Sequence, residues 1–237
     1  MLGPDRALME GLLTGDRTDD LHYRLRLLDL LEVLARKRPS SPLLIPTFVP
    51  LLNLARSVAP LEVELRNKAS KLVRFLVQPR KAADSISPPS PESALEALEE
   101  LHALAQGVEI SEFAPIIAQT AVALVKAALA SPTADASTSA TISTLFGNSF
   151  EQYLWTKNSR TKVQPLLTNE FCKRAPSAAW GMFDRVIQLA KGEVEGDKKA
   201  SVNAFRRMQA FEVAQTLLVG YANLVCFISL CERLFSH

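Results

Sequence analysis

The sequence predicts an all-α fold, an irregular HEAT- or armadillo-like array of about ten helices. First, its 237 residues include 9 Gly and 14 Pro, with many Ala and Leu, which favours helices joined by proline-marked turns. Second, no run alternates apolar and polar residues with the Val, Ile and Thr enrichment of a strand. Third, helical patterns follow one another in pairs without an exact repeat. A compact helical bundle is the alternative.

The first strong helical pattern begins at Asp19 or Asp20, as N-cap, and runs to Arg38, where Pro39 stops it. Its apolar residues are spread widely around the helix, which predicts burial on more than one side. Within it, LLDLL (27–31) matches L-x-x-L-L, a pattern of helices that dock into apolar grooves. We expect these leucines to be buried core, with a docking motif as the alternative.

The later helices are placed by proline and glycine signals. Pro46 and Pro50 limit the regular length of the second helix. Ser90-Pro91 before Glu92 is a helix start with Ser90 as N-cap and Pro91 at N1. A polar break separates two helices at 131–140, and the last helix is expected to bend or split at Gly220. The expected helices lie within 43–57 and at 60–78, 91–106, 114–130, 140–157, 164–174, 177–191 and 199–235.

Charge is distributed in blocks of opposite sign. Residues 21–81 contain 12 Lys and Arg against 4 Asp and Glu, whereas residues 82–155 contain 1 against 9. Such blocks suggest a basic and an acidic face, or two lobes that attract each other. We therefore expect an N-terminal helical lobe with a basic face at 1–81, a linker at 82–91, and a C-terminal lobe at 92–237 packed against the first as one array.

One segment, VAQTLLVGYANLVCFISLC (213–231), carries no charge and approaches the length of a membrane span. It contains Gln215 and Asn223, and Glu212 and Glu232 stand at its ends without a basic flank on one side. We therefore expect a buried core helix and no membrane partner. The odd count of three cysteines favours a reducing compartment, and the N-terminus lacks a signal-peptide pattern.

The sequence offers no pattern for catalysis or for cofactor binding. The three histidines, His22, His102 and His237, are isolated, so we expect no metal site. No serine lies in a G-x-S-x-G turn, and the scattered glycines form no phosphate-binding loop. We expect a non-enzymatic protein without catalytic residues, cofactor or small-molecule substrate.

Basic residues are the candidate contact surface for nucleic acid. Lys68, Lys71 and Arg74 follow i, i+3, i+6 spacing on the third helix, and further cations lie at helix ends. Such cations suit phosphate contacts without base recognition. The alternative is a solvated face, or pairing with the acidic block at 92–112. The candidate contacts are Arg36, Lys37, Arg38, Lys68, Lys71, Arg74, Arg80 and Lys81, with Lys157, Arg160 and Lys162 in the stretch WTKNSRTK.

The segment RLRLLDLLEVLARKRPSSPLLIPTFVPLLNLARS (24–57) resembles the Myb-binding protein 1a family, also called DNA polymerase phi or the fifth yeast polymerase. Members carry a helix of the form "fR-x-R-x-LDLLE", a basic end, and then "P-x-(S/N)-PL". Residues 61–77 and 150–184 resemble the family more weakly, and residues 82–140 match poorly. The residues on the pattern are Arg24, Arg26, Leu28, Asp29, Leu30, Leu31, Glu32, Pro39, Ser41, Pro42 and Leu43.

The resemblance implies a nucleolar or nuclear helical-repeat protein of ribosome biogenesis, of which this chain would be a C-terminal portion. Its implied partners are pre-ribosomal RNA or rDNA chromatin and ribosome-assembly proteins. Polymerase activity is not expected, because an all-α chain lacks the palm sheet whose carboxylates hold two metal ions. The alternative function is a protein-interaction module that binds partner peptides between its helices, without nucleic acid.

Overall fold

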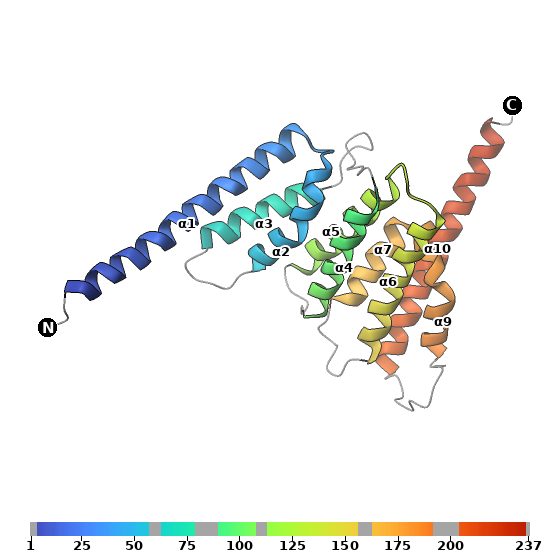
Figure 1. Cartoon of the computed structure of the whole chain (residues 1–237). Helices are drawn as coiled ribbons and strands as arrows, with labels where there is room; N and C mark the ends of the chain where they lie inside the picture. Colours follow the sequence, from blue (N-terminus) through green and yellow to red (C-terminus); the bar gives the residue numbers. More distant parts are fainter. Residues whose placement is uncertain are drawn as a thin grey trace. The chain divides into compact units, whose positions relative to one another are not determined.

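The structure is a computed structural model that describes the backbone of residues 4–56, 63–78, 90–107, 113–155, 163–191 and 204–235, and side chains within these ranges from residue 21 to 226. The described residues form helices and no strand, which confirms the predicted all-α repeat array. The chain divides into two compact units, Met1–Asp84 and Ser85–His237 (Figure 1). The packing of the two predicted lobes into one array and the linker at 82–91 stay predictions.

In the N-terminal unit, one central helix packs against two others. The elements are α1 (Pro4–Lys37), a short 3-10 helix η1 (Pro42–Thr47), α2 (Phe48–Arg56) and α3 (Val63–Val77). The central helix is α3, which contacts both α1 and α2. Pro46 lies within η1 and Pro50 in the first turn of α2, where a missing N–H removes no helical hydrogen bond. Leu44, Ile45, Phe48, Leu52 and Leu65 form the buried core.

The predicted start of the first helix was wrong. It begins at Pro4, a residue that suits the first helical position, and runs through Asp19 and Asp20 without interruption. An aspartate inside a helix costs well under about 1 kcal/mol relative to alanine, so two of them do not end it. The end was predicted within one residue, at Lys37, with Pro39 following shortly after.

The predicted burial of α1 on several sides was also wrong. Among its described side chains only Leu28 and Ala35 are buried, and both belong to the face toward α3. By contrast Leu27 is 41% exposed, Leu30 65% and Val33 55%. A broad apolar stripe predicts burial only where neighbours exist on each side, and α1 packs mainly on α3.

The C-terminal unit is built from helix pairs in two layers. The long helices are α4 (Glu92–Gln106), α5 (Ala114–Leu129), α6 (Ala136–Trp155), α7 (Gln164–Arg174), α9 (Phe183–Lys191) and α10 (Ala204–Phe235). The pairs α4–α5, α6–α7 and α9–α10 are each in contact, α5–α7–α10 form one layer, and α4–α6–α9 form the other (Figure 1). The pairs start at residues 92, 136 and 183, which are 44 and 47 residues apart, a period typical of HEAT-like repeats.

Several helix boundaries differ from the prediction. The N-cap of α4 is Pro91 rather than Ser90, whose side chain instead hydrogen-bonds Glu92 and lowers the pKa of that carboxyl. The start of α6 lies at Ala136 rather than 140, because Asp135 accepts a hydrogen bond from the Thr138 backbone N–H at 2.9 Å. Hydrogen bonds from Ser137 and Thr138 also lower the pKa of Asp135.

The helix expected at 177–191 is three consecutive segments, α8 (Pro176–Ala179), a 3-10 helix η5 (Trp180–Met182) and α9. The last helix does not split at Gly220, since α10 continues through this residue as one helix. A Cβ atom at this position would lie 3.2 Å from the Pro176 Cβ and 3.3 Å from the Cys172 carbonyl oxygen. Glycine therefore allows α10 to approach α7 and α8 closely.

Within the described side chains, the expected helix at 213–231 is buried on one face and exposed on the other. Val213, Ala214 and Leu217 are buried, but Leu218 and Val219 are exposed. Across the described part of the chain, we find no helix that is both long and apolar enough to cross a membrane.

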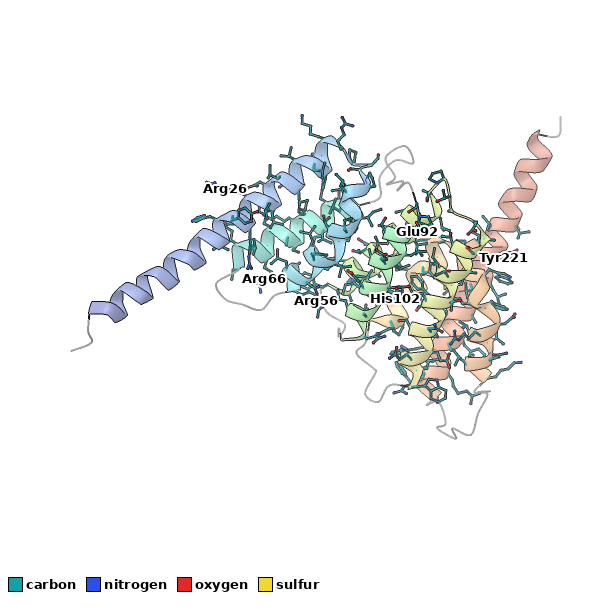
Figure 2. The ribbon with its side chains drawn as sticks, viewed as in Figure 1. Arg26, Arg56, Arg66, Glu92, His102 and Tyr221 are labelled. Carbon is teal, nitrogen blue, oxygen red and sulfur yellow. The ribbon has the colours of Figure 1, made fainter. Side chains whose placement is uncertain are left out.

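The core of the C-terminal unit centres on stacked aromatic rings. Phe146 of α6 lies 3.9 Å from Phe171 of α7, centroid to centroid, in a stacked arrangement. His102 of α4, labelled in Figure 2, meets Phe146 edge-on, with 4.5 Å between the ring centroids. Because His102 is only 3% exposed, a titratable ring lies inside an apolar core.

Candidate nucleic-acid interface

The N-terminal unit presents an excess of basic side chains. Its described side-chain ranges, 21–56 and 63–78, contain ten Lys and Arg against three Asp and Glu. Two of the cations, Arg26 on α1 and Arg66 on α3, are labelled in Figure 2. Such a charge excess attracts anions.

Two of the candidate contacts lie at the junction between α1 and α3, where each is paired within the unit. Lys68 Nζ makes a salt bridge with Asp29 Oδ1. Arg36 Nε donates to Glu32 Oε1 at 3.0 Å, and its guanidinium lies 5.2 Å from the ring centroid of Phe75. Asp29 of α1 contacts Lys68 of α3, and Arg36, seven residues later in α1, contacts Phe75, seven residues later in α3. Since the two contacts advance in the same direction along both helices, α1 and α3 run parallel.

These pairs reduce the cationic charge available for a ligand. Lys68 could have paired with the acidic block at 92–112, but its partner is Asp29 in the same unit. Each further i+3 step along a helix turns by about 60°, so Lys71 and Arg74 lie progressively away from α1. Both are exposed, as are Lys37 and Arg38 at the end of α1. The remaining candidates, Arg80, Lys81, Lys157, Arg160 and Lys162, lie outside the described residues.

Groups with possible chemistry are not gathered elsewhere in the described part of the chain. The described residues contain no group of three or more His, Cys, Asp or Glu placed to hold a metal ion. Burial raises the pKa of the Cys172 thiol to about 12, which leaves almost no thiolate at neutral pH. Burial also lowers the pKa of His102 to about 4, and its ring meets no hydrogen-bond partner among the described residues.

A second kind of surface is exposed and apolar, at segments where the favoured interpretation of the sequence was buried core. We call the first instance the α1 stripe, formed by Tyr23, Leu27, Leu30 and the half-buried Leu34. The second, the α10 outer face, lies opposite the buried residues of α10. It comprises Phe205, Met208, Phe211, Leu218, Val219 and Val225.

The sequence held a signal for each surface. L-x-x-L-L matches Leu27, Leu30 and Leu31, of which the first two are exposed and the third half-buried, while the intervening Leu28 is buried. The favoured interpretation of this segment as core is therefore wrong for Leu27 and Leu30. In α10, apolar residues occur all round the helix although its described neighbours cover one face.

Comparison with known proteins identifies one family. A family model described as "Myb-binding protein 1A-like, TPR repeats" matches residues 38–229. The spacing of the helix pairs in the C-terminal unit exceeds the 34-residue period of regular TPR repeats, consistent with an irregular array. No match was found among curated proteins or among solved structures.

Proposed function

Because the chain belongs to the Myb-binding protein 1A-like family of helical-repeat proteins, we propose that it is a non-enzymatic scaffold of ribosome biogenesis in the nucleolus, holding ribosome-assembly proteins on exposed apolar helix faces. The family is a class of repeat scaffolds for protein interaction rather than an enzyme class. The nucleolar role rests on the resemblance of residues 24–57 to its members. The observation that carries the docking of proteins is the α10 outer face.

The α10 outer face suits a protein partner because it is apolar and nearly uncharged. The charged residues among the exposed side chains described for α10 are Arg207 and Glu212. The arginines near the start of α10 turn toward the bundle, where Arg206 Nη1 donates to the Leu154 carbonyl and Arg207 Nε to the Ala190 carbonyl at 3.0 Å. Burying each half-exposed apolar side chain against a partner contributes about 1 kcal/mol. The fitting partner therefore presents an apolar helical surface.

The test is co-purification of a tagged chain from nuclear extract, scored for ribosome-assembly proteins by quantitative mass spectrometry. We expect Phe211→Asp with Leu218→Asp to lose these proteins, because both residues lie on the outer face. Thr144→Asp with Gln188→Asp is the matched control, since it adds the same charge at exposed polar positions. Retention of the same proteins by the Phe211 and Leu218 variant would exclude α10 as the docking face.

A second function, phosphate contact with pre-ribosomal RNA or rDNA, is supported by the charge excess of the N-terminal unit. Lys37, Arg38, Lys71 and Arg74 are the exposed candidate cations that form no ion pair with a carboxylate in the described part of this unit. Contacts of this kind recognise the charge of the backbone rather than its base sequence. Binding should therefore tolerate changes in sequence and weaken with salt.

Filter binding to a single-stranded RNA at several salt concentrations tests this function. Lys71→Glu with Arg74→Glu should weaken binding and reduce the salt slope by about 0.7 for each phosphate that the variant no longer neutralises. Lys68 is left unchanged because its replacement would also break the Asp29 salt bridge. Lys126→Glu with Lys191→Glu, both exposed in the C-terminal unit, makes the same change in net charge. Equal weakening in the two variants, or no RNA affinity at low salt, would refute the proposed phosphate contact.

A further inference from the structure

The α1 stripe has the geometry of a surface for a second helix. Tyr23 is 62% exposed, Leu27 41% and Leu30 65%, and Leu34 continues the row. The intervals of four, three and four residues are those of a coiled-coil seam, in which apolar positions repeat every 3.5 residues on average. The stripe spans about three turns, or about 16 Å.

The buried residues of α1 leave this face available. Leu28 and Ala35 fix α1 against α3 from the opposite side, so a ligand at the stripe does not compete with the fold. Exposed Val33 and half-buried Leu31 widen the apolar centre on its two edges. A partner helix would therefore meet a continuous apolar strip along its axis.

The rim of the stripe is positively charged. Helical positions place Arg26 and Lys37 along one edge and Arg38 at the other, and all three are exposed. The acidic residues within 21–38, Asp29 and Glu32, lie toward α3. Asp29 pairs there with Lys68, and Glu32 pairs with Arg36. Within residues 21–38, where the side chains of α1 are described, both carboxylates are thus engaged away from the stripe.

We propose that the α1 stripe binds an amphipathic helix of a partner protein whose apolar seam is flanked by glutamate or aspartate. Charges that flank an apolar seam select the partner helix and its orientation. A second copy of this chain fits poorly, because pairing two stripes would bring like charges together. Nucleic acid fits poorly at the centre, which is apolar. This inference names the partner class at one face of the proposed scaffold and so rests on that function.

The probe is a fluorescent helical peptide of about three heptads with leucine at its a and d positions and glutamate at e and g. Its anisotropy is followed as the full chain is added at about 50 mM salt, where charge contacts are weakly screened. We expect saturable binding that Leu30→Asp weakens by about tenfold or more, and that Arg26→Glu with Lys37→Glu weakens in a salt-dependent way. Leu43→Asp, at an apolar position of η1 that is 67% exposed and lies outside both apolar surfaces, is the matched control and should leave the affinity unchanged.

Three outcomes would overturn the inference. These are absence of peptide binding, equal effects of the Leu30 and Leu43 variants, and equal affinity for a peptide with lysine at e and g. Self-association of the chain that Leu30→Asp abolishes, seen by sedimentation, would assign the stripe to a second copy instead. Leu30→Gln, which preserves helix propensity without adding charge, must reproduce the weaker binding with an unchanged circular dichroism spectrum. Failure of the α10 co-purification would leave this direct binding result intact, so the two proposals fail separately.

Discussion

His102 should make the stability of the C-terminal unit fall as the pH is lowered from about 6.5 to about 4. Burial lowers the pKa of this histidine from 6.5 to about 4 in the folded chain, while the unfolded chain retains the ordinary value. Between these two pH values the unfolded state binds the extra proton, so the free energy of unfolding decreases as the solution becomes more acidic. Each pKa unit corresponds to about 1.4 kcal/mol, so the full loss is about 3 kcal/mol and about 2 kcal/mol is lost by pH 5.

Replacing His102 by leucine removes this dependence. Leucine matches the apolar surroundings formed by Phe146 and carries no proton. The stability of His102→Leu relative to the natural chain should therefore rise by about 2 kcal/mol between pH 7 and pH 5. Other titrating groups are common to both proteins and cancel in this difference.

Urea unfolding followed by tryptophan fluorescence measures the free energy of unfolding of the C-terminal unit, which contains His102. Both tryptophans of the chain, Trp155 and Trp180, belong to the C-terminal unit, so the signal reports on the environment of His102. His22→Leu removes an exposed histidine on α1 and is the control. The reasoning is refuted if the stability difference between the natural chain and His102→Leu is the same at pH 7 and pH 5.

Two further predictions concern packing in the same unit. Gly220→Val should destabilise it by about 1–3 kcal/mol, because added atoms would overlap the Cys172 carbonyl. Ala222→Val, exposed on the same helix, should change thermal stability by less than about 0.5 kcal/mol. Phe146→Ala should cost about 3–5 kcal/mol in urea unfolding, because the ring is fully buried. Phe211→Ala on the outer face should cost less than about 1 kcal/mol, and similar losses of stability for both phenylalanines would contradict the assigned core.

The fold class and several helix limits follow from local signals in the sequence. Pro39 and Pro176 stand just beyond the ends of α1 and α7, where a residue without an N–H cannot continue the helix. Asp135 is a subtler local signal, because its capping of α6 depends on Thr138 three residues later. Local chemistry thus determines where helices end more reliably than where a long one begins.

The surfaces were harder to predict because they depend on which helices are neighbours. Leu28 and Leu30 look equivalent in the sequence, yet one packs on α3 and the other is exposed. Likewise, Lys68 and Lys71 share a helix and a charge, but only Lys68 has its ammonium in a salt bridge with Asp29. Periodicity gives the direction of a side chain around its helix, but the partner on that side comes from tertiary packing.

The ring of Trp180 gives the last helix its own optical signal. It stacks with Phe183 of α9 at 4.6 Å and with Tyr221 of α10, which Figure 2 labels, at 4.1 Å, centroid to centroid. Closely stacked rings hold one another in a fixed, chiral arrangement, which produces near-ultraviolet circular dichroism. Detachment of α10 would remove Tyr221 from this group while the stack of Phe146 and Phe171 stayed in place. The chain can therefore report a departure of its final helix spectroscopically, without an added label.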